Sequence, residues 1–268
     1  SFGKATGIDI PFEKGGAVPD SNKYNSMYHF NWNSCTVVFV GMGQGELLLT
    51  PMQMANGMCI IANKGWYYTP HFVKSIGKNP NDTLLRKYHE KHVVLNIPDS
   101  TFNIVQQAME DVVESGTAAG AKIDGVTICA KTGTAENKAI VNGEVIKMQN
   151  HSMFVAFAPR ENPKIAIAVA IENAGFGATW AAPIASLLIE KYLKDSVSVK
   201  RKAMEDKMLN ANLINKYVFT IDSVLRLHDA AVYQARQERK WEADSIKRAE
   251  EFALYRGWIE LQLKKLKK

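Results

Sequence analysis

The sequence predicts an α+β fold in which helices flank an antiparallel sheet, followed by a helical C-terminal tail. Residues 165–171 alternate isoleucine or valine with alanine, as expected for a strand whose two faces pack differently. An apolar run at residues 152–158 precedes this strand, separated from it by a short proline-containing connection. Apolar residues at helical spacing in residues 99–114 and 180–194 supply the flanking helices. Short connections between strands indicate an antiparallel meander.

The other expected elements follow from local signals. Residues 1–51 are rich in glycine, asparagine, serine and proline, which indicates extended segments and turns. A helix should begin after Thr50, because Thr50 can cap it, Pro51 suits its first position and Gln53 completes a capping box. We expect short extended pieces over residues 66–97. We also expect the helix at 180–194 to cover the alanine face of the strand at 165–171, because small side chains permit close approach.

Charge separates the chain into two parts. Residues 1–194 hold 17 basic and 16 acidic residues, whereas residues 195–268 hold 16 and 11, so the tail carries most of the net charge of +6. We therefore predict a domain at 1–194 and a charged helical tail at 195–268. The basic end at 264–268 suits a solvated helix terminus better than a site for anionic lipid or nucleic acid.

Cysteine usage and hydropathy exclude several classes of protein. Three cysteines without close spacing form neither a disulfide framework nor a metal-binding pattern. Four other potential ligands have spacings that match no zinc site: Asp9, Asp20, His29 and Cys35. We predict no metal and no cofactor. No apolar run approaches the length of about 18 residues that indicates a membrane span, and the chain begins without a signal peptide.

The candidate site is a short polar motif that follows a β-branched run at residues 126–129. It reads Lys131-Thr132-Gly133-Thr134 and continues into Ala135. Because the run predicts a strand, we expect the motif at the end of that strand. Lysine supplies positive charge, the threonines supply hydroxyls, and glycine lets a bound backbone approach closely. These groups suit one wall of a cleft for a peptide that ends in a carboxylate. Taken alone, the motif equally fits an exposed strand end running into a polar loop.

In its order of motifs the chain resembles the transpeptidase domain of class B penicillin-binding proteins of the elongation type (penicillin-binding protein 2). The resemblance extends over about residues 2–194 and rests on eight segments: Thr6-Gly7-Ile8-Asp9-Ile10-Pro11; Gly43-Gln44-Gly45; Thr50-Pro51-Met52-Gln53-Met54-Ala55; Ala62-Asn63-Lys64-Gly65; Gly116-Thr117-Ala118; Lys131-Thr132-Gly133-Thr134-Ala135; Phe157-Ala158-Pro159; and Glu172-Asn173. Gln44 favours the elongation type, since the division type usually has an aromatic residue there.

The resemblance implies a serine β-lactamase/transpeptidase-like fold and a peptidoglycan D,D-transpeptidase that β-lactams acylate. A serine attacks the penultimate D-alanine carbonyl of a stem peptide, a nearby lysine is the base, and an amine or water resolves the acyl-enzyme. Lys131 would supply charge, while Thr132, Thr134 and Ala135 would line the substrate site. The Thr134 N–H would form half of the oxyanion hole. The resemblance also implies cell-wall elongation partners and a location on the periplasmic face of the inner membrane.

This sequence departs from the family in the two motifs that hold the nucleophile and the base. Ser-x-Asn is absent, and Ser-x-x-Lys occurs only at residues 1–4 and 75–78, contexts that do not suit the family's helix. We therefore expect the nucleophilic serine, the base lysine and the membrane anchor to lie upstream, so that the chain is an incomplete, inactive C-terminal half of the domain. A non-catalytic β-lactam sensor or scaffold of the same fold is the alternative. A hydrolytic β-lactamase fits the Gly-Gln-Gly segment and long tail less well.

Overall fold

A computed structural model describes residues 2–80, 82–94, 97–141 and 144–266. It divides into two compact units, which we describe separately. The first comprises Ser1–Asn137 and Met148–Ala211, and the second comprises Lys138–Lys147 and Asn212–Lys268. From the sequence we predict that the family domain ends at Lys194. The two compact units do not test this boundary, which stays a prediction.

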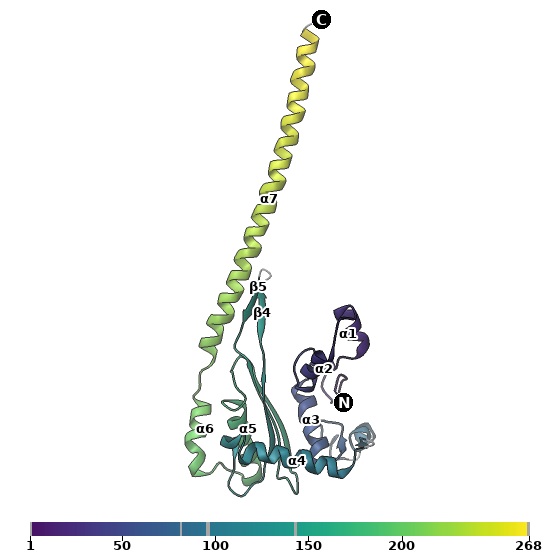
Figure 1. Ribbon diagram of the computed structural model, residues 1–268, viewed down its shortest axis with the longest axis vertical. Helices are drawn as coiled ribbons and strands as arrows, with labels where there is room; N and C mark the ends of the chain where they lie inside the picture. The colour runs from purple at the N-terminus through teal and green to yellow at the C-terminus, as the bar shows by residue number, and fades with distance from the viewer. Residues whose placement is uncertain (1, 81, 95–96, 142–143, 267–268) are drawn as a thin grey trace. The chain divides into compact units, whose positions relative to one another are not determined.

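Helices lie toward both ends of the chain and most of the strands lie in its middle; Figure 1 labels the α-helices. The helices of the first unit are α1 (Ser21–Tyr28), α2 (Ser34–Gly41), α3 (Pro51–Ala62), α4 (Asp99–Glu114), α5 (Ala181–Lys194) and α6 (Lys202–Leu209). Its strands are β1 (Trp66–Tyr68), β2 (Lys91–Val93), β3 (Cys129–Ala135), β6 (His151–Ala158) and β7 (Ile165–Ile171). Short 3-10 turns lie at Thr83–Tyr88, Ala119–Ala121 and Val199–Arg201. The second unit holds β4 (Lys138–Val141), β5 (Glu144–Lys147) and α7 (Ile214–Leu266).

The central sheet has the strand order β3-β6-β7, and both pairs are antiparallel. Ala130 pairs with Ala156, which in turn pairs with Ile167. The predicted α+β meander is therefore confirmed. Among the strands that the structure describes, β3 has a neighbour in this sheet on one side only, so no described strand covers the other edge of the strand that carries Lys131.

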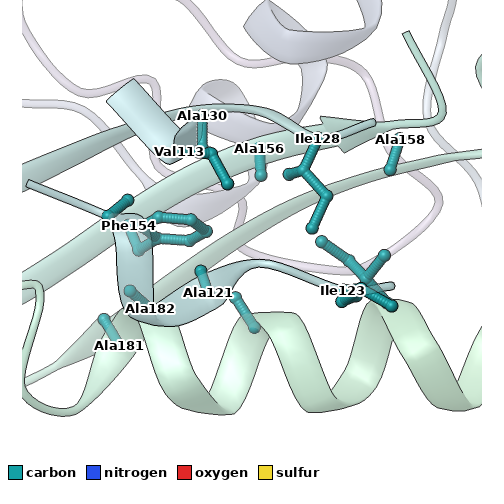
Figure 2. Packing of buried hydrophobic residues seen from close by; sticks show 13 residues of the cluster. Val113, Ala121, Ile123, Ile128, Ala130, Phe154, Ala156, Ala158, Ala181 and Ala182 are labelled. Carbon is teal, nitrogen blue, oxygen red and sulfur yellow. The ribbon is translucent and has the colours of Figure 1, made fainter. Parts of the chain in front are cut away.

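The two faces of the sheet are packed by different helices, and our expectation for α5 was wrong. The isoleucine and valine face of β7 packs with α5, through Ala181, Ala182 and Ala185. Figure 2 shows Ala181 and Ala182 within this buried cluster. The alanine face instead meets α3, whose Met58 and Ile61 join Ala166 in a second cluster. Bulky strand residues thus meet the alanines of α5, together with Ile189, and small strand residues meet the larger side chains of α3, so large and small side chains complement one another in both layers.

This packing predicts opposite outcomes for two α5 variants. Ala185 is completely buried against the sheet, so Ala185→Leu should overpack the core and lower the free energy of unfolding by about 1–3 kcal/mol. Leu188 is 50% exposed, so Leu188→Ala should change it by less than about 1 kcal/mol. Chemical denaturation of the two variants measures both values. A costly Leu188→Ala with a neutral Ala185→Leu would restore the orientation that the sequence suggested.

The N-terminal region is more helical than the sequence indicated. The side chain of Asp20 accepts a hydrogen bond from Lys23 N and caps α1. Asn33 and Thr36 form a capping box that begins α2, so the β-branched residues that follow are helical rather than extended. The expected capping box of α3 is confirmed, with Thr50 and Gln53 bonded reciprocally and Pro51 in the first turn.

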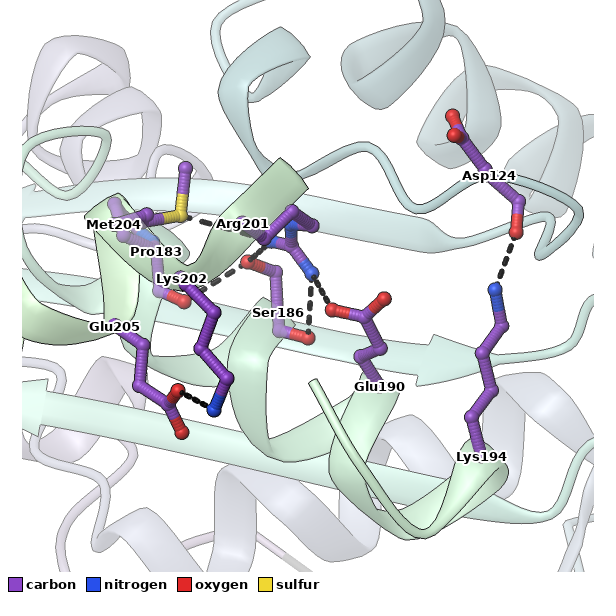
Figure 3. A network of polar contacts seen from close by, with 9 residues as sticks. All are labelled: Asp124, Pro183, Ser186, Glu190, Lys194, Arg201, Lys202, Met204 and Glu205. Carbon is purple, nitrogen blue, oxygen red and sulfur yellow. Dashed lines mark hydrogen bonds and ion pairs between the residues drawn. The ribbon is translucent and has the colours of Figure 1, made fainter. Parts of the chain in front are cut away.

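Beyond α5, a buried ion pair secures the chain to the first unit (Figure 3). Arg201 Nη1 donates to Glu190 Oε2 at 2.8 Å, and the side chain of Glu190 is only 1% exposed. Burial raises the pKa of Glu190, but hydrogen bonds from Arg201 and Ser198 outweigh it and the net shift is downward. The carboxylate therefore stays ionised beside its partner, and the segment leading to α6 remains fixed on α5.

The second unit consists of a hairpin and a long helix. Strands β4 and β5 pair in antiparallel fashion, with Lys138 opposite Lys147, and the sequence analysis did not anticipate them. The helical character predicted for the tail is confirmed by α7. Among the described residues, no helix is both long enough and apolar enough to cross a membrane.

Candidate functional site

The Lys-Thr-Gly motif lies within β3 rather than at its end. The strand runs from Cys129 to Ala135, so the β-branched residues Val126, Thr127 and Ile128 precede it instead of forming it. The cause is pairing with β6, which continues to Ala135 opposite His151. The sequence thus located the correct strand but placed its boundaries too early, and the motif residues share the regular geometry of a strand.

Because successive side chains of a strand point to opposite sides, the site residues of β3 lie on two faces of the sheet. Thr132 and Thr134 share the α5 face with Ala130, which belongs to the buried cluster on that side. Lys131 and Gly133 point to the opposite face together with Cys129. Lys131 is exposed, whereas the next four residues are half-buried. The five predicted site residues therefore form one continuous strand segment, with its charge and its hydroxyls on different sides.

Backbone carbonyl and N–H groups of β3 also point outward on the side of the strand opposite β6, which we call the free edge. Gln44 Nε2 donates to the carbonyl oxygen of Thr134 at 3.0 Å, and Lys131 Nζ donates to that of Thr132 at 2.7 Å. Because the N–H and C=O of one residue in an antiparallel strand point to the same side, the N–H groups of Thr132 and Thr134 face the free edge too. Two donors and an ammonium group therefore lie along this edge.

Thr117 supports the motif from the turn after α4. Its hydroxyl lies 2.7 Å from the hydroxyl of Thr132, and either atom can be the donor. Thr117 belongs to the Gly-Thr-Ala segment that carries part of the family resemblance, but its local sequence predicts no role for it. The contact means that the Thr132 hydroxyl has a protein partner, so Thr134 is the threonine of the motif with the freer hydroxyl among the hydrogen bonds that the structure describes.

A loop between β7 and α5 closes over the sheet at the motif. A Cβ atom at Gly177 would lie 2.3 Å from the carbonyl oxygen of Met153 and 2.5 Å from that of Gly133, so only glycine fits there. Nearby, Ser152 Oγ donates to the Phe176 carbonyl at 2.9 Å and accepts from Ala181 N at 3.1 Å. Gly177 is not among the predicted site residues, because nothing in the local sequence pattern reveals a contact across 44 residues.

The serine candidates do not join the site. Ser1 lies outside the described residues. Ser75 and Lys78 lie in a turn closed by a bridge between Ile76 and Asn79, with Gly77 at a φ of 62°. A turn of this kind does not place a serine and a lysine one helical turn apart, as the family's nucleophile motif does.

The residues considered as metal ligands have other roles or stand apart. Asp9 accepts hydrogen bonds from the N–H groups of Phe72 and Val73, and these bonds lower the pKa of its carboxyl. Asp20 caps α1. Within the described part of the chain, no group of three His, Cys, Asp or Glu side chains is placed to hold a metal ion. Burial raises the pKa of the Cys129 thiol to about 12, so this cysteine is a packed, unreactive side chain.

A small polar cavity lies at the other end of the sheet. It has a volume of about 170 Å³ and is lined by the end of α3, by α4 and by the β6–β7 turn. Arg160 in its wall pairs with Glu110 and bonds through its N–H to the Thr127 carbonyl, before β3 begins. The cavity is therefore separate from the motif, and Arg160, one of its two cationic lining residues with Lys64, is already paired.

Comparison with known proteins gives one consistent relationship. Residues 1–190 match the family described as the penicillin-binding protein transpeptidase domain. The peptidoglycan D,D-transpeptidase MrdA of Acinetobacter baumannii is 32% identical over 200 residues, covering 72% of this chain. The match spans 29% of that relative, so the chain corresponds to less than a third of its length.

Solved structures agree with this match. PBP2 of Pseudomonas aeruginosa, in complex with WCK 5153, has a TM-score of 0.60 at 26% identity and covers 74% of this chain and 42% of its own. PBP2 of Helicobacter pylori, solved in complex with MreC, has a TM-score of 0.54 at 25% identity and covers 72% of this chain and 34% of its own.

Proposed function

The chain belongs to the penicillin-binding protein transpeptidase family, and from this premise we propose that it is part of a peptidoglycan D,D-transpeptidase of the elongation type. One observation carries the proposal. The intact Lys131–Ala135 segment forms a sheet edge whose N–H groups and ammonium point outward. Such an edge suits an extended stem peptide or a β-lactam, both of which present carbonyl and carboxylate oxygens.

In the proposed reaction, a serine outside this chain attacks the penultimate D-alanine carbonyl. Its hydroxyl proton passes to a base, an ester bond forms, and the terminal D-alanine leaves with a proton once the tetrahedral intermediate collapses. The N–H of Thr134 donates to the developing oxyanion, which is stabilised more strongly than the ground-state carbonyl. An acceptor amine then attacks the ester, which forms the cross-link and regenerates the serine hydroxyl.

The remaining motif residues would bind the substrate's carboxylate end. Lys131 is exposed at the edge, so its charge can attract an anion. Thr134 would donate its hydroxyl to the carboxylate, and Ala135 would line the continuation of the strand. Thr132, whose hydroxyl already meets Thr117, would help mainly by orienting the strand. No metal or cofactor enters this scheme.

We further propose that the full-length protein acts on the periplasmic face of the inner membrane with cell-wall elongation proteins. The H. pylori PBP2 structure was solved in complex with MreC, which supports a partner of that kind for this family member. A catalytically inactive sensor or scaffold is the alternative function. The complete Lys131–Thr134 segment and its supporting contacts favour the enzyme, because an inactive protein need not retain them.

Mass spectrometry after incubation with penicillin tests the function directly. We expect a stoichiometric adduct on the full-length protein, at a serine outside residues 1–268, and no adduct on the 268-residue chain. An adduct on Ser75 would overturn our interpretation of that turn. A full-length protein that folds but forms no adduct would favour the sensor or scaffold without acyl chemistry.

A further inference from the structure

Gln44 connects a distant turn to the strand that carries the motif. Its side-chain amide reaches the Thr134 carbonyl across 90 positions of sequence, at 3.0 Å. The turn itself is fixed, because Gln44 N donates to the Phe39 carbonyl at 2.9 Å. Gly43 and Gly45 on either side have φ values of 77° and 67°, a conformation that glycine adopts without strain. The amide is therefore presented from a defined turn.

This contact changes which hydrogen-bonding groups remain available at the free edge of β3. An uncovered strand edge presents alternating N–H donors and C=O acceptors. Here the Thr134 acceptor is occupied by Gln44 and the Thr132 acceptor by Lys131 Nζ, while the N–H groups of both threonines stay at the edge. At these two threonines the carbonyl oxygens each accept a hydrogen bond already, while the N–H groups face outward, which favours a carbonyl or carboxylate oxygen over an N–H group there.

We propose that Gln44 is a positioning residue that occupies the Thr134 carbonyl and so aims the Thr134 N–H at the acyl oxygen. This inference rests on the proposed function, and it adds a specific task for a residue that does not touch the reacting atoms. Two features support it. The hydrogen bond ends on the same residue whose N–H serves the oxyanion, and Gln44 is half-buried, so water competes weakly for its amide.

Three variants of the full-length protein test the proposal. Gln44→Ala removes the donor, and its acylation by a fluorescent penicillin should slow by about 5–10-fold at pH 7.5. Gln44→Glu keeps the shape but places a carboxylate against the carbonyl, so its rate should fall by at least about tenfold. Gln234→Glu makes the same charge change at an exposed position on α7 and should retain the parent rate.

The pH dependence separates positioning from general destabilisation. A protonated glutamic acid can donate to the Thr134 carbonyl, whereas a carboxylate cannot. The rate of Gln44→Glu divided by that of the parent should therefore rise toward acid pH as the carboxylate takes up its proton. The ratio of the Gln44→Ala rate to the parent rate should not change with pH. A Gln44→Glu ratio that is near one, or that does not change with pH, would overturn the proposal.

Hydrogen–deuterium exchange of the β3 peptide in the same proteins supplies a readout without acylation. Exchange should become faster in Gln44→Ala and remain unchanged in Gln234→Glu. If the parent protein is not acylated, the proposed function fails, and exchange still decides whether Gln44 holds the strand. Unchanged exchange in Gln44→Ala would show that it does not.

Discussion

Lys131→Ala in the full-length protein should slow penicillin acylation by about 100-fold or more, with little loss of stability. Removing a preorganised charge from an acyl-transfer site typically has an effect of this size. Because Lys131 is exposed and bonds only to a neighbouring carbonyl in the described structure, the free energy of unfolding should change by less than about 1 kcal/mol. Stopped-flow measurement with a fluorescent penicillin gives the rate constant, and chemical denaturation gives the stability.

Two further variants complete this measurement. Lys164→Ala removes another exposed lysine of the first unit and should keep the parent rate, which controls for net charge. Thr134→Val removes a hydroxyl while keeping the shape, and we expect a decrease of about tenfold. Equal acylation rates in parent, Lys131→Ala and Thr134→Val would remove this segment from the active site.

Gly177→Ala should damage both stability and acylation, because its Cβ would meet the backbone oxygens of Met153 and Gly133. Backbone in a sheet cannot move aside as a flexible side chain can, so the loop must lift or β3 must shift. We expect a loss of about 3 kcal/mol in the free energy of unfolding, at the upper end for overpacking. Any displacement of β3 should also slow acylation, since small misplacements at a reacting centre are costly.

Gly120→Ala provides the matched control, because a Cβ at Gly120 would have no neighbour within 4 Å. Its melting temperature and acylation rate should equal those of the parent. A Gly177→Ala protein with parental stability and rate would mean that the loop does not press on the sheet at Gly133.

Local signals in the sequence predicted local structure well. The cap, proline and capping box at Thr50–Gln53 placed the start of α3 correctly, since all of these interactions lie within one turn. The alternation in β7 likewise identified its two faces. The extended structure predicted over residues 1–51 is wrong at residues 37–40, because the Asn33–Thr36 capping box begins a helix there.

Contacts between distant segments were beyond sequence reasoning. Nothing in the alternation of β7 states which helix covers which face, and the answer depends on the small side chains that α5 contributes. The Lys131–Ala135 site was found from its motif alone. Its support by Gln44, Thr117 and Gly177 became visible only in three dimensions, because each lies far from the motif in sequence.

The central claim is that the edge of β3 holds the reacting carbonyl, and a crystal structure of the full-length protein acylated by penicillin tests it most directly. We predict that the carbonyl oxygen of the acyl-enzyme lies about 2.7–3.1 Å from the Thr134 nitrogen. The carboxylate of the drug should lie beside Lys131 and the Thr134 hydroxyl. An acyl-enzyme whose carbonyl oxygen points away from β3, with neither Thr134 nor Lys131 in contact, would contradict the claim.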